Sequence, residues 1–339
     1  MKAEEAKNLV VKAGIELMKS GLIARTWGNI SCRIDNETFA VTPSGRDYSS
    51  LKPEDIVEVN IDDLSYEGSI KPSSEKGIHK EVYSCFPDVN FVIHTHQEYA
   101  SAISASGLDQ IPVPNEYISG SFSENILCAK YALPGTKSLR KNAAVCLKKT
   151  SSNAVILKHH GALCFGKDYD NTFMTAHRLE EICLNFINKN GGYISADKAC
   201  DAIVPPQINE VITRISKKKG GNLVFCNNAQ VLKCAALPSP LMPYLDDYAQ
   251  IIGPKAKVCN NDEREIIKGL NHSSAVLIKN VGALCRGQNK KDAEAVCMIL
   301  KKNSNAYLTA KLFNNLNPIN PFESMLMRFV YLKKYSKLY

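Results

Sequence analysis

The chain has 339 residues, of which 45% are hydrophobic and 22% are charged, a composition typical of folded globular proteins and not of disordered chains. No apolar run approaches the roughly 18 residues of a membrane span, and the N-terminal segment carries acidic side chains that a secretory signal lacks, so we expect a cytoplasmic protein. The 12 cysteines include no CxxC pair, which favours reduced thiols over disulfides or a cysteine zinc site.

The net charge of +8 is unevenly distributed. Residues 204–339 contain 20 Lys/Arg and 9 Asp/Glu, a net charge of +11, whereas the rest of the chain has a net charge of −3. A solvated surface is the ordinary explanation for such an excess, and a face that binds polyanions is the alternative. No nucleic-acid-binding motif accompanies the lysines, so neither nucleic acid nor membrane is expected as a partner.

The hydrophobic pattern predicts helices and strands that alternate through the first 200 residues. Apolar residues recur with helical spacing near the N-terminus, and Gly21 marks the end of that helix. In chain order, we expect a helix over 3–19, strands over 38–42 and 56–61, a helix after Glu75, a strand over 89–96, a helix over 98–106, a strand from 154 to His160, and a helix over 169–188. This mixture predicts an α/β protein in which helices cover a sheet.

An internal repeat divides the chain into two domains. Ser152–Gly166 and Ser273–Gly287 are identical at nine of fifteen positions, which is far beyond chance for a β-rich segment. Asn90–Ala105 aligns more loosely with Asn222–Leu237. We therefore expect a first domain over residues 1–200 and a truncated, degenerate copy of the same fold over residues 205–339.

Three histidines are candidates for a metal site. His94 and His96 lie in an extended apolar run, where residues i and i+2 point to the same side of a strand and can share one ion. His160 comes at the end of another predicted strand, directly before Gly161, which would allow a close backbone approach. The alternative is that these imidazoles are ordinary surface or core residues.

Glu75 follows two serines, Ser73 and Ser74, at the predicted start of a helix. A helix cap is one explanation, because serine hydroxyls and acidic side chains both favour helix N-termini. The same hydroxyls and helix amides suit a phosphate group, and a carboxylate beside a metal suits proton abstraction. Asn29, Ser44 and Gly45 lie in two predicted tight turns, where small donors either hold an anion or simply form the turn.

The order of these motifs is more specific than any one of them. TWGNIS, TPSG, SSE, HTH, CAKYALPGT and HHG occur once each and in sequence. Over about residues 3–190 the chain resembles the class II aldolase and adducin-head family, above all its members that act on L-fuculose phosphate. The resemblance implies a three-layer α/β fold with a largely antiparallel sheet flanked by helices. Two departures from the family pattern stand out, Lys130 in place of proline and His159 in place of asparagine.

The resemblance also implies roles for the candidate residues. His94, His96 and His160 would bind Zn2+, with Mn2+ or Co2+ as alternatives, and Glu75 would be both a fourth ligand and the catalytic base. Tyr131 would be the catalytic acid, supplied by a neighbouring subunit of a homo-oligomer. The substrate phosphate would be held by Asn29, Ser44, Gly45, Ser73 and Ser74.

The expected function is therefore a zinc-type lyase, an aldolase that cleaves or forms a small sugar phosphate through a metal-stabilised enediolate. A pentose-phosphate 4-epimerase or dehydratase is one alternative, although glutamate at position 75 favours the aldolase. A non-catalytic scaffold like the adducin head is the other. In the second copy, Cys226, Asn228 and Val281 align with the three histidines. We therefore expect it to be metal-free and to serve as a structural partner in a pseudo-fourfold ring.

Overall fold

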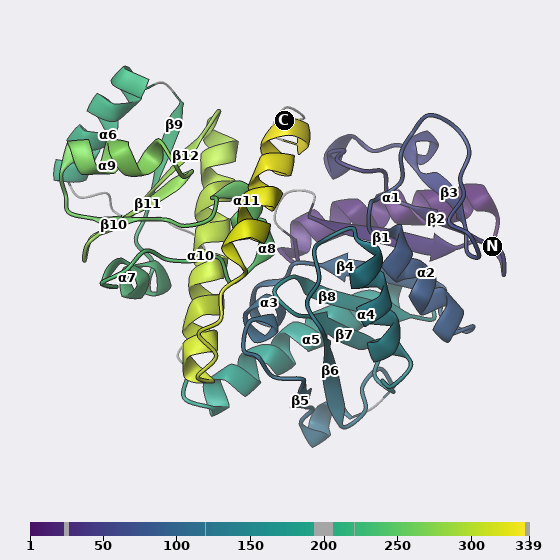
Figure 1. The fold of residues 1–339 in the computed structure, drawn as a ribbon. Coiled ribbons are helices and arrows are strands. Elements are labelled where there is room, and N and C mark those ends of the chain that lie inside the picture. The colour runs from purple at the N-terminus through teal and green to yellow at the C-terminus, as the bar shows by residue number, and fades with distance from the viewer. Residues whose placement is uncertain (24–26, 119, 193–205, 220, 336–339) are drawn as a thin grey trace. The chain divides into compact units, whose positions relative to one another are not determined.

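A computed structural model of the chain describes residues 1–23, 27–118, 120–192, 206–219 and 221–335 (Figure 1). The chain forms two compact units, Met1–Lys189 and Asn190–Lys337. The predicted domain junction between residues 191 and 205 falls almost entirely outside the described residues. Among the described residues, no helix has the length and apolar character needed to cross a membrane.

The first unit is built on a sheet with the strand order β3-β2-β1-β4-β8-β7-β6-β5. Every neighbouring pair is antiparallel except β6 and β7, so the prediction of a largely antiparallel sheet is confirmed. The strands are β1 (Gly28–Arg33), β2 (Thr38–Val41), β3 (Val57–Asn60), β4 (Phe91–Thr95), β5 (Gln110–Pro112), β6 (Asn125–Ala129), β7 (Ala154–Leu157) and β8 (Gly161–Gly166).

Helices pack on both faces of this sheet. Val92 of β4 belongs to a buried cluster that includes Ile78 and Leu139 from two helices on one face. Phe91, the next residue, points the other way and packs against Tyr169 of a third helix at 5.6 Å between ring centroids. The helices are α1 (Ala3–Ser20), α2 (Lys76–Cys85), α3 (Glu98–Ser104), α4 (Lys137–Leu147) and α5 (Tyr169–Lys189), with short 3-10 turns at Tyr48–Ser50, Pro53–Asp55 and Asn115–Tyr117.

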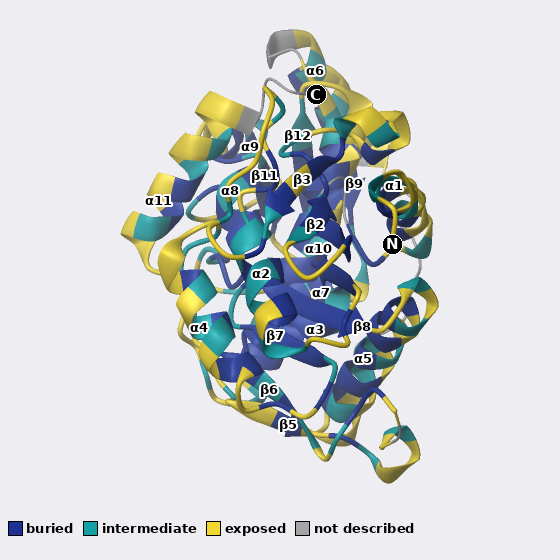
Figure 2. Cartoon of the chain, turned by 90° about the vertical axis from the view of Figure 1, so that its right-hand side faces the viewer, coloured by how far each residue is buried: buried dark blue, intermediate teal, exposed yellow. Residues whose placement is uncertain are grey.

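Figure 2 shows that the strands are mainly buried, whereas the outer helix faces are exposed. Two predictions about the local structure were wrong. The segment that begins at Gly28 is a strand rather than a tight turn, because β1 pairs with both β2 and β4 and this pairing outweighs the turn preference of its glycine and asparagine. His160 is not in a strand, since β7 ends at Leu157 and the histidine lies in the turn before β8.

The second unit has a smaller sheet with the strand order β10-β11-β12-β9. Buried apolar residues of its strands and helices form their own core, which includes Ile208, Phe225, Ile266 and Val276. Its strands are β9 (Asn222–Cys226), β10 (Val258–Cys259), β11 (Ala275–Ile278) and β12 (Gly282–Gly287). Its helices are α6 (Pro206–Lys219), α7 (Ala229–Ala235), α8 (Asp246–Ile251), α9 (Glu263–Leu270), α10 (Lys290–Leu312) and α11 (Pro321–Val330), and a π-helical turn, Tyr331–Tyr335, follows α11.

The hairpin β11–β12 of the second unit matches the hairpin β7–β8 of the first. In both, a non-glycine residue in the turn has a left-handed backbone, His159 and Asn280, each with φ of 58°. In both, the second strand pairs antiparallel with a strand that leads into a short helix, β4 in one and β9 in the other. The repeated sequence thus forms the same local structure twice.

Sheet register corrects our looser alignment of the two copies by one residue. Thr95 pairs with Ala162 in the first unit, and Cys226 pairs with Ala283, the equivalent of Ala162, in the second. Cys226 is therefore equivalent to Thr95 and not to His94. The error arose because the two copies differ in the length of the segment between these strands, and hydrophobic matching alone does not reveal a shift of one position.

Candidate metal centre

The predicted histidines lie at the middle of the first sheet. His94 belongs to β4, which lies between β1 and β8, and His96 follows directly after the strand ends. His94 is fully buried, and only 7% of His96 and 2% of His160 are exposed. Each ring is therefore shielded from bulk solvent. At such a buried site, an ion can be held by protein ligands alone.

Gly161 brings His160 to the end of β4. A Cβ added to this glycine would lie 2.2 Å from the backbone oxygen of Thr95, so only glycine allows β8 to approach β4 this closely. The residue before it, His160, thereby comes level with His94 and His96. The sequence prediction that this glycine allows a close backbone approach is thus confirmed.

The three imidazoles form a compact cluster. Their potential ligand atoms all lie within 4.8 Å of one another, and no other group of this kind occurs among the described residues. The Nε2 atoms of His94 and His96 are 3.0 Å apart, and the rings of His94 and His160 stack at 4.7 Å between centroids. Three nitrogen atoms that converge in this way suit a single divalent ion.

Glu75 completes the cluster from the N-terminal end of α2. Its Oε2 atom lies 3.3 Å from His94 Nε2, and its Oε1 atom lies 3.1 Å from His160 Nε2. Only 9% of this side chain is exposed. Burial alone would raise the pKa of the Glu75 carboxyl, but the neighbouring His160 and His94 outweigh burial and hold this pKa well below its usual range.

The donor set fits a zinc-type ion. His94 Nδ1 lies 2.8 Å from the backbone oxygen of Ala162, which can only accept, so the hydrogen is on Nδ1 and the Nε2 lone pair faces the cluster. Burial lowers the pKa of His94 to about 3, which keeps the imidazole neutral, as a metal ligand must be. Three imidazoles and one carboxylate are a common set for Zn2+, Mn2+ or Co2+.

The two loops predicted to bind phosphate lie side by side. Pro43 and Pro72 form an isolated bridge, the backbone N–H of Ser44 donates to the Lys71 oxygen at 2.9 Å, and that of Ser73 donates to the Thr42 oxygen at 3.0 Å. These contacts bring together Ser44, Gly45, Ser73 and Ser74. Neither serine is the residue that caps α2, because Glu75 itself occupies that position, and Ser73 Oγ accepts from its N–H at 3.2 Å.

Asn29, the fifth predicted phosphate ligand, contacts Glu75. Its Nδ2 atom lies 3.0 Å from Glu75 Oε2. Its Oδ1 atom is hydrogen-bonded to Nε2 of His79, a fully buried residue that sequence analysis missed. The signal was present, because Glu75 and His79 are four residues apart and therefore share one face of α2.

Tyr131 lies in the loop after β6. Its ring packs edge-on against His159, the neighbour of His160, at 5.3 Å between ring centroids. Its backbone oxygen accepts a hydrogen bond from Asn142 Nδ2 at 3.2 Å, which ties the loop to α4. Within one chain, the tyrosine is therefore attached to the turn that carries the third histidine.

The sequence profile of the class II aldolase and adducin N-terminal domain family matches residues 8–187, which is more than half of the chain. The chain belongs to this family. The first unit, with its histidine cluster and Glu75, lies almost wholly within the matched residues.

Several known proteins are similar to more than half of the chain. The 5-deoxy-D-ribulose 1-phosphate aldolase of Bacillus thuringiensis serovar kurstaki is 33% identical over 181 residues, which cover 53% of this chain and 83% of that one. The L-fuculose phosphate aldolase of Escherichia coli K12 is 30% identical over 180 residues, 53% of this chain and 81% of that one. The solved structure of YgbL from Klebsiella pneumoniae, 22% identical, covers 58% of this chain and 97% of its own with a TM-score of 0.51, and shares the fold.

The second unit has different residues at the positions of the ligands. By sheet register, Phe225 and Asn227 are equivalent to His94 and His96, and Val281 is equivalent to His160. Phenylalanine and valine carry no ligand atom. The side chains that make the cluster of this aldolase-family chain therefore come from the first unit alone.

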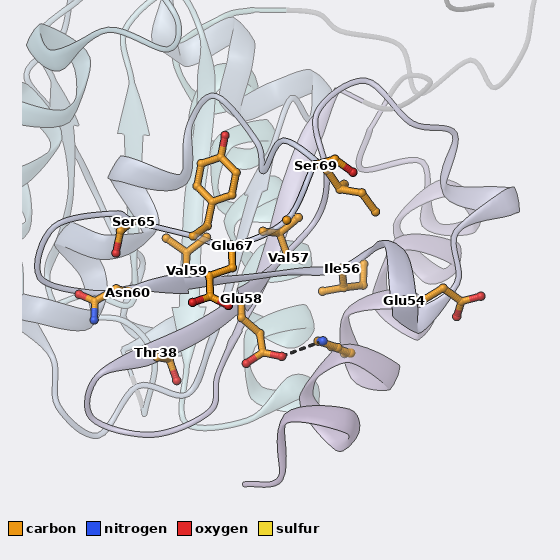
Figure 3. Close-up of a pocket in the computed structure, with 14 residues that line it drawn as sticks. Thr38, Glu54, Ile56, Val57, Glu58, Val59, Asn60, Ser65, Glu67 and Ser69 are labelled. Atoms are coloured by element: carbon orange, nitrogen blue, oxygen red, sulfur yellow. Dashed lines mark ion pairs between the residues drawn. The ribbon is translucent and has the colours of Figure 1, made fainter.

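A separate groove of about 740 Å³ lies at the edge of the first sheet, between β3 and the segment Ser65–Ile70 (Figure 3). Its lining includes Glu54, Glu58 and Glu67, and Lys7 forms an ion pair with Glu58 at 2.7 Å. Three carboxylates against one lysine disfavour an anionic sugar phosphate. The groove also shares no residue with the histidine cluster, so it is not a candidate for the substrate site.

Proposed function

We propose that this chain is a metal-dependent aldolase that cleaves or forms a small sugar phosphate. The observation that carries the proposal is the contact of Glu75 with two of three clustered imidazoles, next to two bridged loops rich in small donors. A carboxylate in this place can act on a substrate that is held by the same ion. The two aldolases compared above act on phosphorylated ketoses, as their names state.

In this proposal, His94, His96 and His160 hold a divalent ion, Zn2+ or alternatively Mn2+ or Co2+, with Glu75 as a fourth ligand. When bound, the ion would supply Lewis-acid polarisation of the substrate carbonyl. Glu75 would remove or return the proton at C3 of the substrate, because its carboxylate lies at the centre of the cluster with little access to solvent.

The substrate phosphate would lie against the bridged loops. Asn29 and Ser73 are buried, whereas Ser44 and Gly45 are half-buried and Ser74 is exposed, so the proposed donors extend from the neighbour of Glu75 to the surface. An anion held here would position the reacting carbons near the carboxylate.

We assign the acid role to Tyr131, which would protonate the departing aldehyde oxygen during cleavage. Its edge-on contact with His159 fixes its loop beside the histidine turn of its own chain. In a homo-oligomer the same loop would face the site of a neighbouring copy. Turnover in mixed oligomers of Tyr131→Phe and Glu75→Gln chains would show which chain supplies the acid.

We also propose that residues 1–200 form the catalytic domain and that residues 205–339 are a truncated repeat without a metal. The matching hairpins and the equivalence of Val281 with His160 support this division. As a structural partner, the repeat would take the place of a subunit in a pseudo-fourfold ring. Mass measurement of the intact assembly would test that arrangement.

The central experiment combines metal analysis with product identification. The purified protein is expected to contain about one divalent ion per chain, and to convert L-fuculose 1-phosphate or 5-deoxyribulose 1-phosphate into dihydroxyacetone phosphate and an aldehyde. Ribulose 5-phosphate tests the epimerase alternative, since an epimeric pentulose phosphate would replace cleavage. Glu75→Gln should abolish turnover while the metal is retained. Glu54→Gln, in the separate groove, should leave turnover unchanged. Absence of metal uptake would leave only a scaffold role.

A further inference from the structure

A row of polar side chains runs inward from the metal centre, between β1 and α2. Alternate residues of a strand share a face, and residues four apart share a face of a helix. Two such faces meet here, and each contributes buried polar groups in register with the other. The residues are Asn29 and Ser31 on β1, Glu75 at the N-cap of α2, and His79 and Tyr83 on α2.

These side chains are joined by consecutive hydrogen bonds. Asn29 Nδ2 lies 3.0 Å from Glu75 Oε2, and Asn29 Oδ1 is bonded to His79 Nε2. Ser31 Oγ lies 2.7 Å from His79 Nδ1 and 2.7 Å from the Tyr83 hydroxyl. The exposed fraction of Asn29 is 5%, of Tyr83 2%, and of Ser31 and His79 zero, so water does not compete for these bonds.

The direction of each hydrogen bond follows from the carboxylate. Ionised Glu75 can only accept, so the amide nitrogen of Asn29 must face it, and the amide oxygen must then accept from His79 Nε2–H. A neutral imidazole carries one hydrogen, so His79 Nδ1 accepts from the Ser31 hydroxyl. The Ser31 oxygen in turn accepts from the Tyr83 hydroxyl, and every donor in the row points toward Glu75.

The environment supports these protonation states. Burial lowers the pKa of His79 to about 3, with a further decrease from the nearby His94, so the imidazole is neutral at physiological pH. Burial also holds the pKa of Tyr83 well above its usual range, so its hydroxyl keeps the hydrogen that it donates. Tyr83 is fixed further by the Arg33 guanidinium, which lies over its ring at 4.6 Å.

We propose that His79 is a positioning residue that holds the Asn29 amide with its nitrogen toward Glu75. The amide nitrogen has two hydrogens, and with one bonded to Glu75 the other is available to an oxygen of an anionic substrate. His79 thus acts through Asn29 on both the carboxylate and the anion site, without contacting substrate itself. The proposal rests on the proposed function for its catalytic consequence, whereas the amide orientation is a property of the free protein.

The decisive variants change the hydrogen bonds of His79 while its bulk is retained. In His79→Gln, the side-chain amide can still donate to Asn29 and accept from Ser31. In His79→Leu neither bond forms, so the Asn29 oxygen loses its donor and only the contact with Glu75 still orients the amide. Ser31→Ala removes only the hydroxyl that fixes the imidazole tautomer, and it serves as the second variant if His79→Leu does not fold.

Loss of a group that orients a metal-site residue typically costs about 10–100-fold in activity or metal affinity, and we expect such a loss in kcat for His79→Leu and Ser31→Ala, with most of it recovered in His79→Gln. Binding of inorganic phosphate should weaken in the same two variants. A lower melting temperature with unchanged kcat and unchanged phosphate binding would mean that the row is only structural, and would overturn the proposal.

A spectroscopic measurement separates this proposal from the proposed function. Nitrogen-15 NMR of the histidine rings in the wild-type protein should show His79 as the Nε2–H tautomer, assigned by loss of its signals in His79→Gln. The Nδ1–H tautomer would overturn the proposal whatever the enzyme does. If the protein cleaves no sugar phosphate but His79 is the Nε2–H tautomer and phosphate binding weakens in His79→Leu, the proposed function fails and the positioning role stands.

Discussion

His160 Nε2 lies 3.1 Å from Oε1 of Glu75, although one residue is in the turn before β8 and the other is at the start of α2. Neither a turn nor a helix end determines locally which residues it contacts. The contact between His160 and Glu75 is therefore set by the tertiary fold. The contact is favourable without an ion only when the imidazole carries a hydrogen toward the carboxylate. A divalent ion would satisfy both groups together with His94 and His96, so metal should stabilise the folded chain.

The first prediction concerns His160→Val. Valine is the residue that occupies the equivalent turn position, Val281, in the second unit, so the hairpin should still fold. Zn2+ at about 100 times its dissociation constant should stabilise the wild-type protein by about 2.7 kcal/mol, and should stabilise the variant much less. Urea unfolding with and without the ion measures the difference. An equal effect of zinc on both proteins would place the ion elsewhere.

The second prediction concerns Gly161→Ala. The added Cβ would meet the Thr95 oxygen at 2.2 Å, so β8 must move away from β4 and carry His160 with it. Overpacking of this kind costs about 1–3 kcal/mol of unfolding free energy, and the stabilisation by zinc should decrease as well.

Gly68→Ala is the matched control for that variant. Gly68 has φ of 85° and nothing within 4 Å of an added Cβ, so alanine there brings backbone strain of about 1–2 kcal/mol without a steric clash. Its response to zinc should equal that of the wild-type protein. If both variants keep the full zinc response, the close approach of β8 to β4 does not position the histidine.

Much of the site could be predicted because its information is local. The i, i+2 spacing places His94 and His96 on one side of any strand, and a helix after Glu75 follows from its periodicity. By contrast, β1 has the turn-forming residues Gly28 and Asn29, and only its pairing with two neighbouring strands makes it extended. No local pattern specifies such pairing.

The hydrogen-bonded row behind Glu75 could not be predicted for a related reason. His79 shows helical spacing from Glu75, but its partner Ser31 lies on a strand far away in the sequence. Their contact depends on the register between β1 and α2, which is set by packing. The misalignment of Cys226 with His94 has the same origin, since sheet register is a tertiary property.

The third prediction concerns Glu180 of α5. Its carboxylate accepts from the backbone N–H groups of Tyr99 and Ala100, at 2.7 and 3.0 Å, and so caps α3, which follows His96. Burial nevertheless raises the pKa of Glu180 from an ordinary 4.5 to about 7, because the loss of hydration outweighs these bonds and nearby Glu98 adds to the shift.

The sign of the pH effect follows from this raised pKa. Between about pH 4.5 and 7 the folded state holds a proton on Glu180 that the unfolded state has lost, so stability falls as pH rises through this range. The unfolding free energy should decrease by about 3 kcal/mol across this pH range, and Glu180→Gln should abolish that decrease. The unfolding free energy of Glu180→Gln and of the wild-type protein is measured by denaturation at several pH values. In Glu98→Gln, most of the change of this free energy with pH should remain. Parallel pH profiles for wild type and Glu180→Gln would contradict the assignment.

The fourth prediction concerns His159, which has φ of 58°. Asparagine is several-fold enriched in left-handed backbone, and Asn280 has the same φ in the second hairpin. His159→Asn should therefore keep or increase the unfolding free energy by up to about 1 kcal/mol, whereas His159→Val should decrease it by about 1–3 kcal/mol because β-branched residues resist this conformation. Asn280→His is the reciprocal control and should be mildly destabilising.

His159→Asn also distinguishes the backbone preference of the turn from the contact between His159 and Tyr131. Asparagine cannot replace the imidazole ring that packs edge-on against the tyrosine, so the loop after β6 loses this contact, and the backbone preference of asparagine offsets that loss in the unfolding free energy. If that contact positions Tyr131 as the acid, His159→Asn should lower kcat without lowering stability. Unchanged kcat together with higher stability would mean that His159 serves the turn alone and that Asn142 is enough to hold the loop.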